Sequence, residues 1–471
     1  MQNFIFSKVY DSPIKDVFDW HKNILALERI TPSWDNILFE NRSTQTNNFL
    51  QDGKLTLIQE ILPFIKLKWV IKHSKYIENE SFYDEMLKGP FKSWQHKHVF
   101  EELNSASTLI KDEISFSSWI NIKKLNEFIV NKIKKSFNYR SMILEHDLKN
   151  KIENTNKNYV LMTGATGAIG QSLMSYLNSL GYKIIFLKYS KSSINAPVIE
   201  EYVNDSDDIL TIKWNPYHKN TLELPKSISK KIKFLINLAG ENILGLWTKS
   251  KKKKISNSRI QSTRSLYRLA VKSNLNFDCC IHSSAIGFYG SNPGIDIDEG
   301  HPTGKGFLAL TTNLWEKEQD KFRDLTKRNI HLRIGNVLSY KGGIIGSIKT
   351  PFKLGLPGYV GNGENYLNWI SLEDILRIIG FSFCNKTIDG PVNAVSPNPI
   401  KSKYFFSTVA RKFGWNFTLK IPAILPKLFL KELVEELVLV DQSIKPKKLI
   451  HAKYEFFNTD LNKALDNILG S

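Results

Sequence analysis

The clearest chemistry offered by residue types and their spacing is phosphate binding by a glycine-rich turn. Gly164, Gly167 and Gly170 are spaced three apart, directly after an apolar segment that begins at Tyr159. The first glycine permits a tight turn, the second lets the main chain approach a pyrophosphate, and the third lets a helix pack closely on the preceding strand. The N-terminus of that helix offers unpaired N–H groups to an anion. The predicted dinucleotide contacts are Gly164, Thr166, Gly167, Ala168, Ile169 and Gly170.

An ordinary βα turn is the alternative, and the surrounding sequence favours the nucleotide site. Apolar residues recur at helical spacing from Ile169 to Leu180, and Gly181 follows as a stop signal. The residues therefore predict a strand, a tight turn and a helix start in that order.

A basic segment lies about 20 residues beyond the glycines, where an NAD-selective site places Asp or Glu on the ribose 2′-hydroxyl. This chain has Lys188, Ser190 and Lys191 there, after a second apolar run, and no acid. These side chains suit a 2′-phosphate, so we predict NADP as the cofactor, with NAD still possible. The alternative that they are exposed loop residues stays open.

Small residues end another apolar run, Lys233–Leu238, and would let the nicotinamide half lie close to the main chain. The predicted contacts at this turn are Asn237, Ala239 and Gly240.

The elements that must position these turns follow an alternating pattern from Asn158 onward. Short apolar runs alternate with helical stretches, and the strand candidates are 183–187, 209–213, 233–238, 279–284 and 331–333. This rhythm is typical of an α/β Rossmann-like, doubly wound parallel sheet. Beyond residue 340, Gly- and Pro-rich segments are typical of substrate-binding loops, although turns without function are equally rich in glycine.

The first 148 residues have a different pattern. Segments 54–59 and 107–116 alternate between apolar and polar residues and predict antiparallel strands, and 122–148 predicts one long helix. We expect a curved sheet wrapped around that helix. The polar stretch 149–158 is the best domain boundary, and the tail from Ile421 to Leu469 predicts a small helical subdomain.

Composition limits the class of protein. The chain has 471 residues, more than one hydrophobic core usually serves, and 42% of them are hydrophobic. No signal peptide and no apolar run of about 18 residues is evident, and three cysteines do not form a disulfide framework, so we expect a cytoplasmic protein without a membrane span. The net charge of +19 comes from scattered lysines, which disfavours nucleic-acid binding.

The N-terminal 145 residues or so resemble the START-like (polyketide cyclase/dehydrase) superfamily. The matching segments are Ser12-Pro13, Val17–His21, Thr31–Trp34, Gly89–His98 and Phe137–Arg140. The resemblance implies an α+β helix-grip domain with an apolar ligand or a packing role. His96 and His98 would share one strand face and, with His73, raise the question of a metal; without a nearby acidic or cysteine cluster we expect ordinary strand histidines and no metal.

Residues 158–470 resemble the extended short-chain dehydrogenase/reductases, and within them the nucleoside-diphosphate-sugar epimerase-like family that carries a small C-terminal domain of unknown function. The matching segments are 163–170, 237–241, 247–248, 258–260 with 263–264, 283–290, 333–338 and 369–375. Arg259 joins the predicted cofactor contacts through this resemblance. The expected domains are 1–148 (START-like), 149–158 (linker), 159–415 (NAD(P)-binding) and 416–471 (small helical).

The departure from the wider superfamily concerns proton transfer, which there relies on a Tyr-x-x-x-Lys pair. Where that pair would fall, the chain reads Phe307–Glu316 without either residue, and Ala285 stands near the place of the assisting serine. Ser284 and Tyr289 are the tentative catalytic residues, although Tyr289 also fits a packing role. Glu241 and Glu299 are weaker acid–base candidates.

We therefore expect an NADP-binding oxidoreductase or epimerase-like protein that acts on a small-molecule substrate beside Ser284 and Tyr289, under the loop 355–365. A non-catalytic dinucleotide-sensing or ligand-carrying protein is the alternative. A third, weaker interpretation gives the main role to the N-terminal domain as an apolar-ligand carrier. A homodimer is left open.

Overall fold

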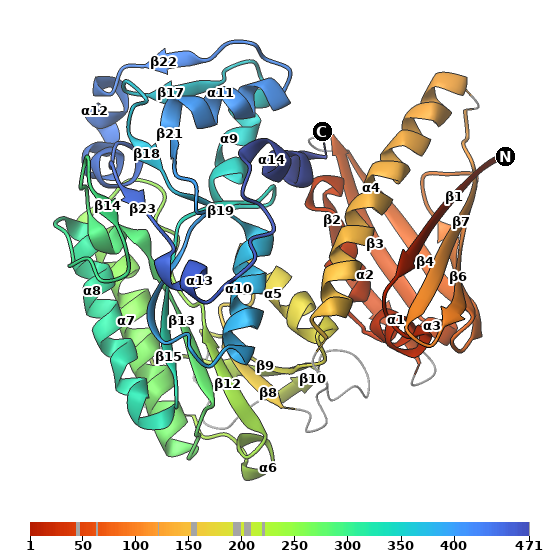
Figure 1. The fold of residues 1–471 in the computed structure, drawn as a ribbon, viewed down its shortest axis with the longest axis horizontal. Coiled ribbons are helices and arrows are strands. Elements are labelled where there is room, and N and C mark those ends of the chain that lie inside the picture. Colours follow the sequence, from red (N-terminus) through yellow and green to blue (C-terminus); the bar gives the residue numbers. More distant parts are fainter. Residues whose placement is uncertain are drawn as a thin grey trace.

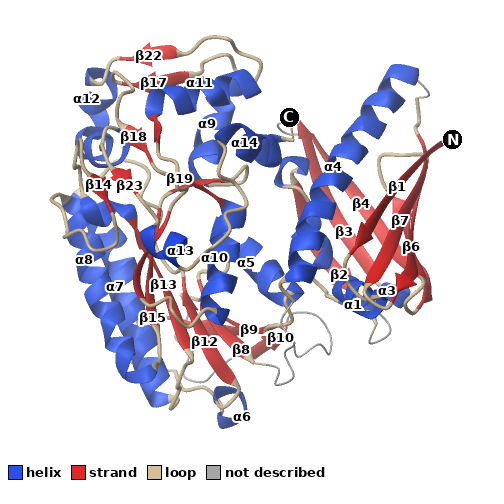
Figure 2. Cartoon of the chain, viewed as in Figure 1, coloured by secondary structure: helices blue, strands red, loops and turns tan. Residues whose placement is uncertain are grey.

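The structure, a computed structural model, describes residues 1–43, 48–62, 65–120, 122–151, 158–191, 199–201, 209–218 and 222–470. Figures 1 and 2 show two bodies side by side: an antiparallel sheet with one long helix, formed by the N-terminal residues, and a larger α/β part. Most of the linker predicted at 149–158 lies outside the described residues. Among the described residues, no helix has the length and apolarity needed to cross a bilayer.

The N-terminal sheet is antiparallel and has seven strands in the order β1-β7-β6-β5-β4-β3-β2. The predicted long helix is α4 (Lys123–Lys149), which packs with the shorter helices α1 (Ile14–Lys22) and α2 (Ala26–Ile30), whereas α3 (Phe49–Asp52) packs on β4 (Ile65–Ile77). Phe18, Phe82 and Phe100 pack together between α1 and the sheet. The strands are β1 (Gln2–Tyr10), β2 (Ile37–Ser43), β3 (Lys54–Leu62), β4 (Ile65–Ile77), β5 (Ser81–Lys88), β6 (Ser93–Asn104) and β7 (Ser107–Ser117).

The second sheet has eight strands in the order β10-β11-β9-β8-β12-β13-β15-β20, all parallel except β10, which pairs antiparallel with β11. It confirms the predicted parallel α/β sheet. The strands are β8 (Tyr159–Thr163), β9 (Lys183–Tyr189), β10 (Ile199–Glu201), β11 (Ile209–Trp214), β12 (Ile232–Asn237), β13 (Cys279–Ala285), β15 (Asn329–Ile334) and β20 (Gly390–Ala394).

Both faces of this sheet are covered by helices, because successive residues of a strand point to opposite sides. Val160 and Met162 of β8 pack on the side of α5 (Ala168–Ser179) and α10 (Leu372–Cys384). Tyr159 and Leu161 pack on the other side, against the apolar residues of α7 (Lys249–Lys272). The helix α8 (Phe307–Gln319) packs beside α7, and the short α6 (Lys226–Ser229) precedes β12.

Residues beyond 335 gather mainly at one end of the parallel sheet, where they appear in teal and blue in Figure 1. The helices there are α9 (Gly343–Lys353), α11 (Ser402–Lys412), α12 (Ile424–Leu433), α13 (Lys447–His451) and α14 (Leu461–Leu469). Four two-stranded sheets link this region: β14 (Asp296–Ile297) with β23 (Ser443–Ile444), β16 (Asn336–Leu338) with β19 (Trp369–Ser371), β17 (Gly358–Val360) with β22 (Leu419–Ile421), and β18 (Tyr366–Leu367) with β21 (Ile400–Lys401).

The tail after residue 416 includes helices, and it also contributes two strands to pairs with earlier parts of the chain. β22 joins β17, and β23 joins β14. Apolar residues of α14 also share a core with α9 and α11. A domain boundary at 416 stays a prediction.

Candidate functional site

The predicted turns meet at the middle of the parallel sheet. β8 lies between β9 and β12, and Thr163 at its end pairs with Leu187 on one side and Asn237 on the other. The chain order reverses here, since the strands to one side of β8 are β9, β11 and β10 and the strands to the other are β12, β13, β15 and β20. Ligands of open α/β sheets bind outside the carboxyl ends of the strands at such a switch point. The register thus brings the Gly164 turn, Lys188 and Leu238 to one edge.

The three glycines differ in what surrounds them. Gly164 has φ of +74°, and a Cβ there would lie 2.6 Å from the Leu238 carbonyl carbon. A Cβ on Gly170 would lie 2.2 Å from the Gly164 oxygen, so this glycine is needed for the close contact between turn and helix. A Cβ on Gly167 would meet only the Gly164 oxygen, at 3.4 Å. Gly167 is therefore the glycine with open space before it, as expected of the position that faces a ligand.

The start of α5 presents main-chain donors. Gly167 is its N-cap, and no side chain of the described residues caps the first turn. Thr166, Gly167 and Ala168 are exposed, whereas Ile169 is half-buried against the core. A helix start with this exposure and without an acidic residue in its first turn fits a pyrophosphate.

The end of β9 has the predicted basic side chains on the surface. Lys188 and Lys191 are exposed, and Ser190 donates its main-chain N–H to the Trp214 carbonyl at 2.9 Å. Lys188 pairs with Lys213 of β11. The chain after Lys191 lies outside the described residues as far as 198.

Asn237 is buried and bonded within the protein. It accepts a hydrogen bond from Thr163 Oγ1 at 2.8 Å, and its Nδ2 donates to Thr263 Oγ1 at 3.0 Å. These bonds tie β8, β12 and α7 together directly below the turn, so the Asn237 side chain supports the site from beneath.

Beyond Asn237, the main chain comes to the surface at Ala239 and Gly240. Arg259 of α7 lies against Gly240, donates to the Glu241 carbonyl at 3.0 Å and packs over the Trp315 ring. Burial lowers the pKa of Arg259 to about 10, so it remains a cation at neutral pH. It is a cationic group held at the edge where the nucleotide is predicted to lie.

The two tentative catalytic hydroxyls belong to one buried network. Ser284 Oγ donates to Glu316 Oε1 at 2.5 Å, and Arg333 binds the same carboxylate through two nitrogens at 2.9 and 2.8 Å. Tyr289 OH accepts from Arg333 Nη1 at 2.9 Å and donates to Asn393 Oδ1 at 2.6 Å. Both hydroxyls are thus engaged with protein groups, and a role for them in proton transfer stays a prediction.

Burial raises the pKa of Tyr289 to about 12, so the phenol is protonated at neutral pH. No functional role was predicted for Glu316 or Arg333 from the sequence. A signal existed, because Arg333 is a charged residue inside the apolar run of β15, and a buried arginine requires a partner.

The remaining acid–base candidates occupy different environments. Glu241 is exposed and pairs with Lys251 at 2.8 Å. Glu299 is buried, and its Oε1 accepts the main-chain N–H groups of Asn393 and Lys448, both at 3.2 Å. Glu299 therefore holds the end of β20 and the start of α13 together.

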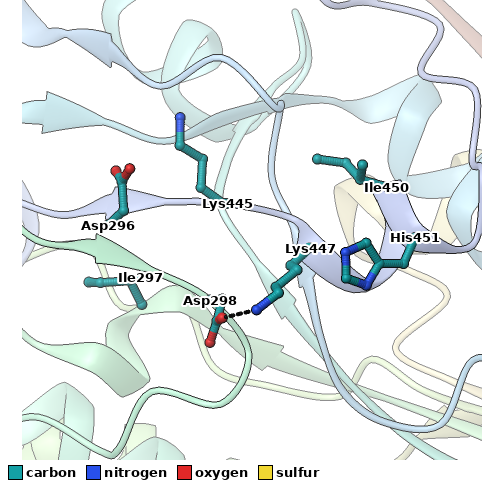
Figure 3. Close-up of a pocket in the computed structure, with 7 residues that line it drawn as sticks. All are labelled: Asp296, Ile297, Asp298, Lys445, Lys447, Ile450 and His451. Carbon is teal, nitrogen blue, oxygen red and sulfur yellow. Dashed lines mark hydrogen bonds and ion pairs between the residues drawn. The ribbon is translucent and has the colours of Figure 1, made fainter.

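A cavity of about 360 Å³ lies away from the glycine turn, between β14 and the start of α13 (Figure 3). Asp298 and Lys447 pair across it at 2.9 Å. Figure 3 also shows Asp296, Lys445 and His451 around this opening. None of the residues that line it is a predicted cofactor contact, so it does not add to the dinucleotide site.

Comparison with known proteins places the fold and the turn in a family. Residues 160–313 match the profile of the NAD dependent epimerase/dehydratase family. Epimerase family protein YfhF of Bacillus subtilis is 32% identical over 314 residues, which cover 66% of this chain and 97% of that protein. Epimerase family protein SAR0825 of Staphylococcus aureus is 27% identical, over 66% of this chain and 98% of its own length.

Solved structures extend the comparison to the whole chain. The nucleoside-diphosphate sugar epimerase from Corynebacterium glutamicum superposes with a TM-score of 0.74 and 26% identity, over 99% of this chain and 90% of its own. Human epimerase family protein SDR39U1, solved with NADPH, superposes over 66% of this chain and 99% of its own, with a TM-score of 0.56 and 24% identity. Since the Bacillus relative is 32% identical and matched over nearly its full length, the chain belongs to the NAD-dependent epimerase/dehydratase family.

Proposed function

We propose that the chain binds NADP(H) across the carboxyl ends of β8, β9 and β12 and transfers hydride to or from a small-molecule substrate. The observation that carries this proposal is the glycine turn at the switch point, with Gly167 open before an uncapped helix start. A nicotinamide dinucleotide bound there would supply the hydride. The protein would bind the pyrophosphate through main-chain N–H groups of α5.

The preference for NADP(H) rests on charge at the end of β9. Lys188 and Lys191 are exposed near the edge where the 2′-position of the adenosine ribose would lie, and no acid stands between Lys188 and Lys191. Cations stabilise a 2′-phosphate, whereas a carboxylate would favour a free 2′-hydroxyl. Human SDR39U1, solved with NADPH, shares this fold, which is consistent with the choice.

Calorimetric titration with NADPH and NADH, in parallel, tests the site. Gly167→Trp fills the open space before α5 and should abolish binding of both nucleotides. Lys188→Glu combined with Lys191→Glu should weaken NADPH tenfold to a hundredfold, since a charged contact contributes about 1.5–3 kcal/mol, and should leave NADH nearly unchanged. Lys226→Glu with Lys230→Glu makes the same charge change on exposed lysines before β12, at the opposite end of the strand, and should change neither affinity.

Two results would overturn the cofactor assignment. Wild-type protein that binds neither nucleotide would make the glycine turn purely structural. If the two double variants lost NADPH affinity equally, the loss would come from the change in net charge and not from a contact with the 2′-phosphate.

A second candidate function is dinucleotide sensing or ligand carriage without chemistry. Two observations favour it: Phe307–Glu316 at the start of α8 lacks the Tyr-x-x-x-Lys pair, and the hydroxyls of Ser284 and Tyr289 are bonded to Glu316, Asn393 and Arg333. NADPH oxidation with nucleoside-diphosphate sugars, suggested first by the name of the Corynebacterium protein, discriminates the two. Turnover that disappears in Gly167→Trp would exclude the sensing function.

An apolar ligand in the N-terminal domain stays a separate proposal from its START-like resemblance. Solvent extraction of the purified chain followed by mass spectrometry tests it, and the absence of any co-purified apolar compound would count against it.

A further inference from the structure

A group of histidines and aspartates lies inside the N-terminal sheet. We name it the histidine cluster: His73, Asp84, His96, His98 and Asp112. The strand register brings these residues together, because His73 pairs with Asp84, Asp84 pairs with His96, and His98 pairs with Asp112 across β4, β5, β6 and β7. All are buried except Asp84, whose side chain is 14% exposed. The four strands run side by side in the same order.

The contacts of His96 fix which of its nitrogens carries hydrogen. His96 Nε2 lies 2.9 Å from Asp112 Oδ1 in a hydrogen bond. An ionised carboxylate only accepts, so Nε2 must carry the hydrogen, and a neutral ring then has its lone pair on Nδ1. Nδ1 faces Asp84 Oδ2 at 3.8 Å. The other oxygen of Asp84 is engaged by His73 Nδ1 at 2.6 Å.

His98 has a carboxylate on each of its two nitrogens. Nε2 lies 3.4 Å from Asp84 Oδ2, and Nδ1 lies 2.8 Å from Asp112 Oδ1 without hydrogen-bond geometry to any described residue. A neutral imidazole has a single N–H, so one of these contacts would set a lone pair against a carboxylate. The arrangement requires a further positive charge, either a second proton on His98 or a cation beside it.

We propose that the histidine cluster binds one divalent transition-metal ion of the Zn²⁺ type, through Asp84 Oδ2, His96 Nδ1 and His98 Nε2. Donor atoms of a tetrahedral Zn²⁺ site at about 2.0–2.1 Å from the ion are roughly 3.3–3.4 Å apart, which the separations of 3.4 and 3.8 Å approach. One donor atom from each of the three residues lies within 4.8 Å of the others.

The surrounding residues fit this role. Metal-binding histidines characteristically donate their second N–H to a carboxylate, and Asp112 stands in that position for His96 and beside His98. His73 orients Asp84 in the same way. Arg140 interacts electrostatically with Asp84 and Asp112 and also with Asp35, so one guanidinium faces three carboxylates and a divalent ion would offset the excess negative charge.

A second group with donor atoms in range, His146, Asp147 and Glu373, does not qualify. Arg29 binds both carboxylates, with four contacts of 2.7–2.8 Å. The positive charge that balances these two carboxylates is therefore Arg29, a residue of the protein, and no metal ion is needed. The group therefore serves as a natural control for the proposed site.

The test uses the full chain, stripped with chelator and titrated calorimetrically with Zn²⁺. We expect one equivalent to bind with a Kd below about 1 µM, and we expect Co²⁺ in its place to give visible absorption bands. Asp84→Asn and His98→Gln should each weaken Zn²⁺ at least a hundredfold. Asp112→Asn should weaken it tenfold to a hundredfold, the range found for groups that orient a ligand. His146→Gln should leave the affinity unchanged.

Circular dichroism and thermal melting without metal establish that each variant is folded. Zn²⁺ should raise the melting temperature of the wild type and of His146→Gln, and this shift should be lost in His98→Gln. If a cluster variant does not fold, His96→Gln and the wild-type Co²⁺ spectrum decide the question. Absence of a stoichiometric site in the wild type, or unchanged affinity in the folded cluster variants, would overturn the proposal and identify His98 as a buried imidazolium. NADPH binding is measured separately and does not bear on either result.

Discussion

At the scale of single residues, the three glycines of the turn have different roles: two shape the site and one keeps it accessible. Gly164 and Gly170 allow the strand, turn and helix to approach one another, whereas Gly167 leaves the space in front of α5 open. This division follows from what an added methyl group would meet at each position, and it leads to a prediction that separates stability from binding.

Gly170→Ala should destabilise the chain, because its Cβ would lie 2.2 Å from the Gly164 oxygen and 2.6 Å from the Ala165 Cα, both main-chain atoms. We expect a loss of about 1–3 kcal/mol in the free energy of unfolding, measured by urea denaturation. Gly167→Ala is the matched control and should stay within about 0.5 kcal/mol of the wild type. Equal destabilisation of the two variants would contradict the assignment.

The hydroxyl groups near the predicted substrate position have a different character. Tyr289 both accepts and donates a hydrogen bond inside the core, and Ser284 donates to Glu316. Each holds the end of a strand or its following turn in place. Proton donation by either hydroxyl would break one of these buried hydrogen bonds. We therefore expect the proton donor among groups that the bound substrate brings close.

At the scale of elements, Asp374 at the start of α10 fastens the tail of the chain to the α/β sheet. Ser371 caps the helix by accepting the Asp374 N–H at 3.0 Å. The Asp374 carboxylate then accepts the main-chain N–H groups of Phe457 and Asn458 at 2.8 and 3.2 Å. The start of α10 is therefore also the attachment point for the segment that leads into α14.

Asp374→Ala should loosen this attachment, since it removes the acceptor of the N–H groups of Phe457, which is half-buried, and Asn458, which is buried. We expect a cost of about 2–4 kcal/mol in the free energy of unfolding and faster hydrogen exchange over residues 454–470. Asp460→Ala is the control, because it removes an exposed cap of α14 that accepts the Lys463 N–H, and should cost about 1 kcal/mol. Unchanged exchange in the tail of Asp374→Ala would refute the proposed attachment.

Sequence patterns predicted elements well where the signal was local. The turn from Gly164 to Gly170, the helix α4 and the strands around β8 each depend on periodicity or glycine spacing within a short segment. The histidine cluster depends on register between strands: Asp84 and Asp112 meet His96 and His98 only because β5 and β7 flank β6. No acidic cluster adjoins these histidines along the chain, because their carboxylate partners lie across the sheet on neighbouring strands.

The pairing of the tail strands could not be predicted for the same reason. β22 and β23 are three and two residues long, too short for an alternating pattern, and their partners lie far away in the sequence. Long-range pairing of this kind is decided by the packing of the whole region.

At the scale of the whole molecule, Arg29 joins the N-terminal body to the α/β body. It comes from α2 and binds Asp147 at the end of α4 and Glu373 at the start of α10, while Ser179 of α5 donates to the same Asp147 carboxylate. The guanidinium is 3% exposed and also packs over the Tyr176 ring. This buried network fixes how the two bodies sit against each other.

Arg29→Met should destabilise the chain strongly, because it leaves the buried Asp147 carboxylate without a guanidinium partner and Glu373 with Arg377 alone. Breaking a buried ion pair on one side costs about 3–5 kcal/mol, which urea denaturation can resolve. Lys8→Met is the control: it removes the exposed pair with Glu145 and should cost at most about 1 kcal/mol. The double variant Arg29→Met, Asp147→Leu should recover much of the loss, since apolar groups replace one pair of charges and Glu373 keeps its ion pair with Arg377 at 2.8 Å.

The same network sets an expected dependence on pH. Although burial alone would raise them, Arg29 holds the pKa values of Asp147 and Glu373 below their ordinary values of 3.8 and 4.5, and Arg377 adds to the effect at Glu373. A carboxyl whose pKa is lower in the folded state stabilises that state above its ordinary pKa, and the contribution is lost as the pH falls toward the folded value. The free energy of unfolding of the wild type should therefore drop below about pH 4.5 more steeply than that of the double variant Arg29→Met, Asp147→Leu, in which Asp147 is absent and Glu373 has lost one of its two guanidinium partners. Urea titrations at a series of pH values from 7 to 3 measure the slope of unfolding free energy against pH for both proteins. The other buried carboxyls titrate equally in the two proteins and so cancel in the comparison. Parallel curves would show that this network does not contribute to acid sensitivity.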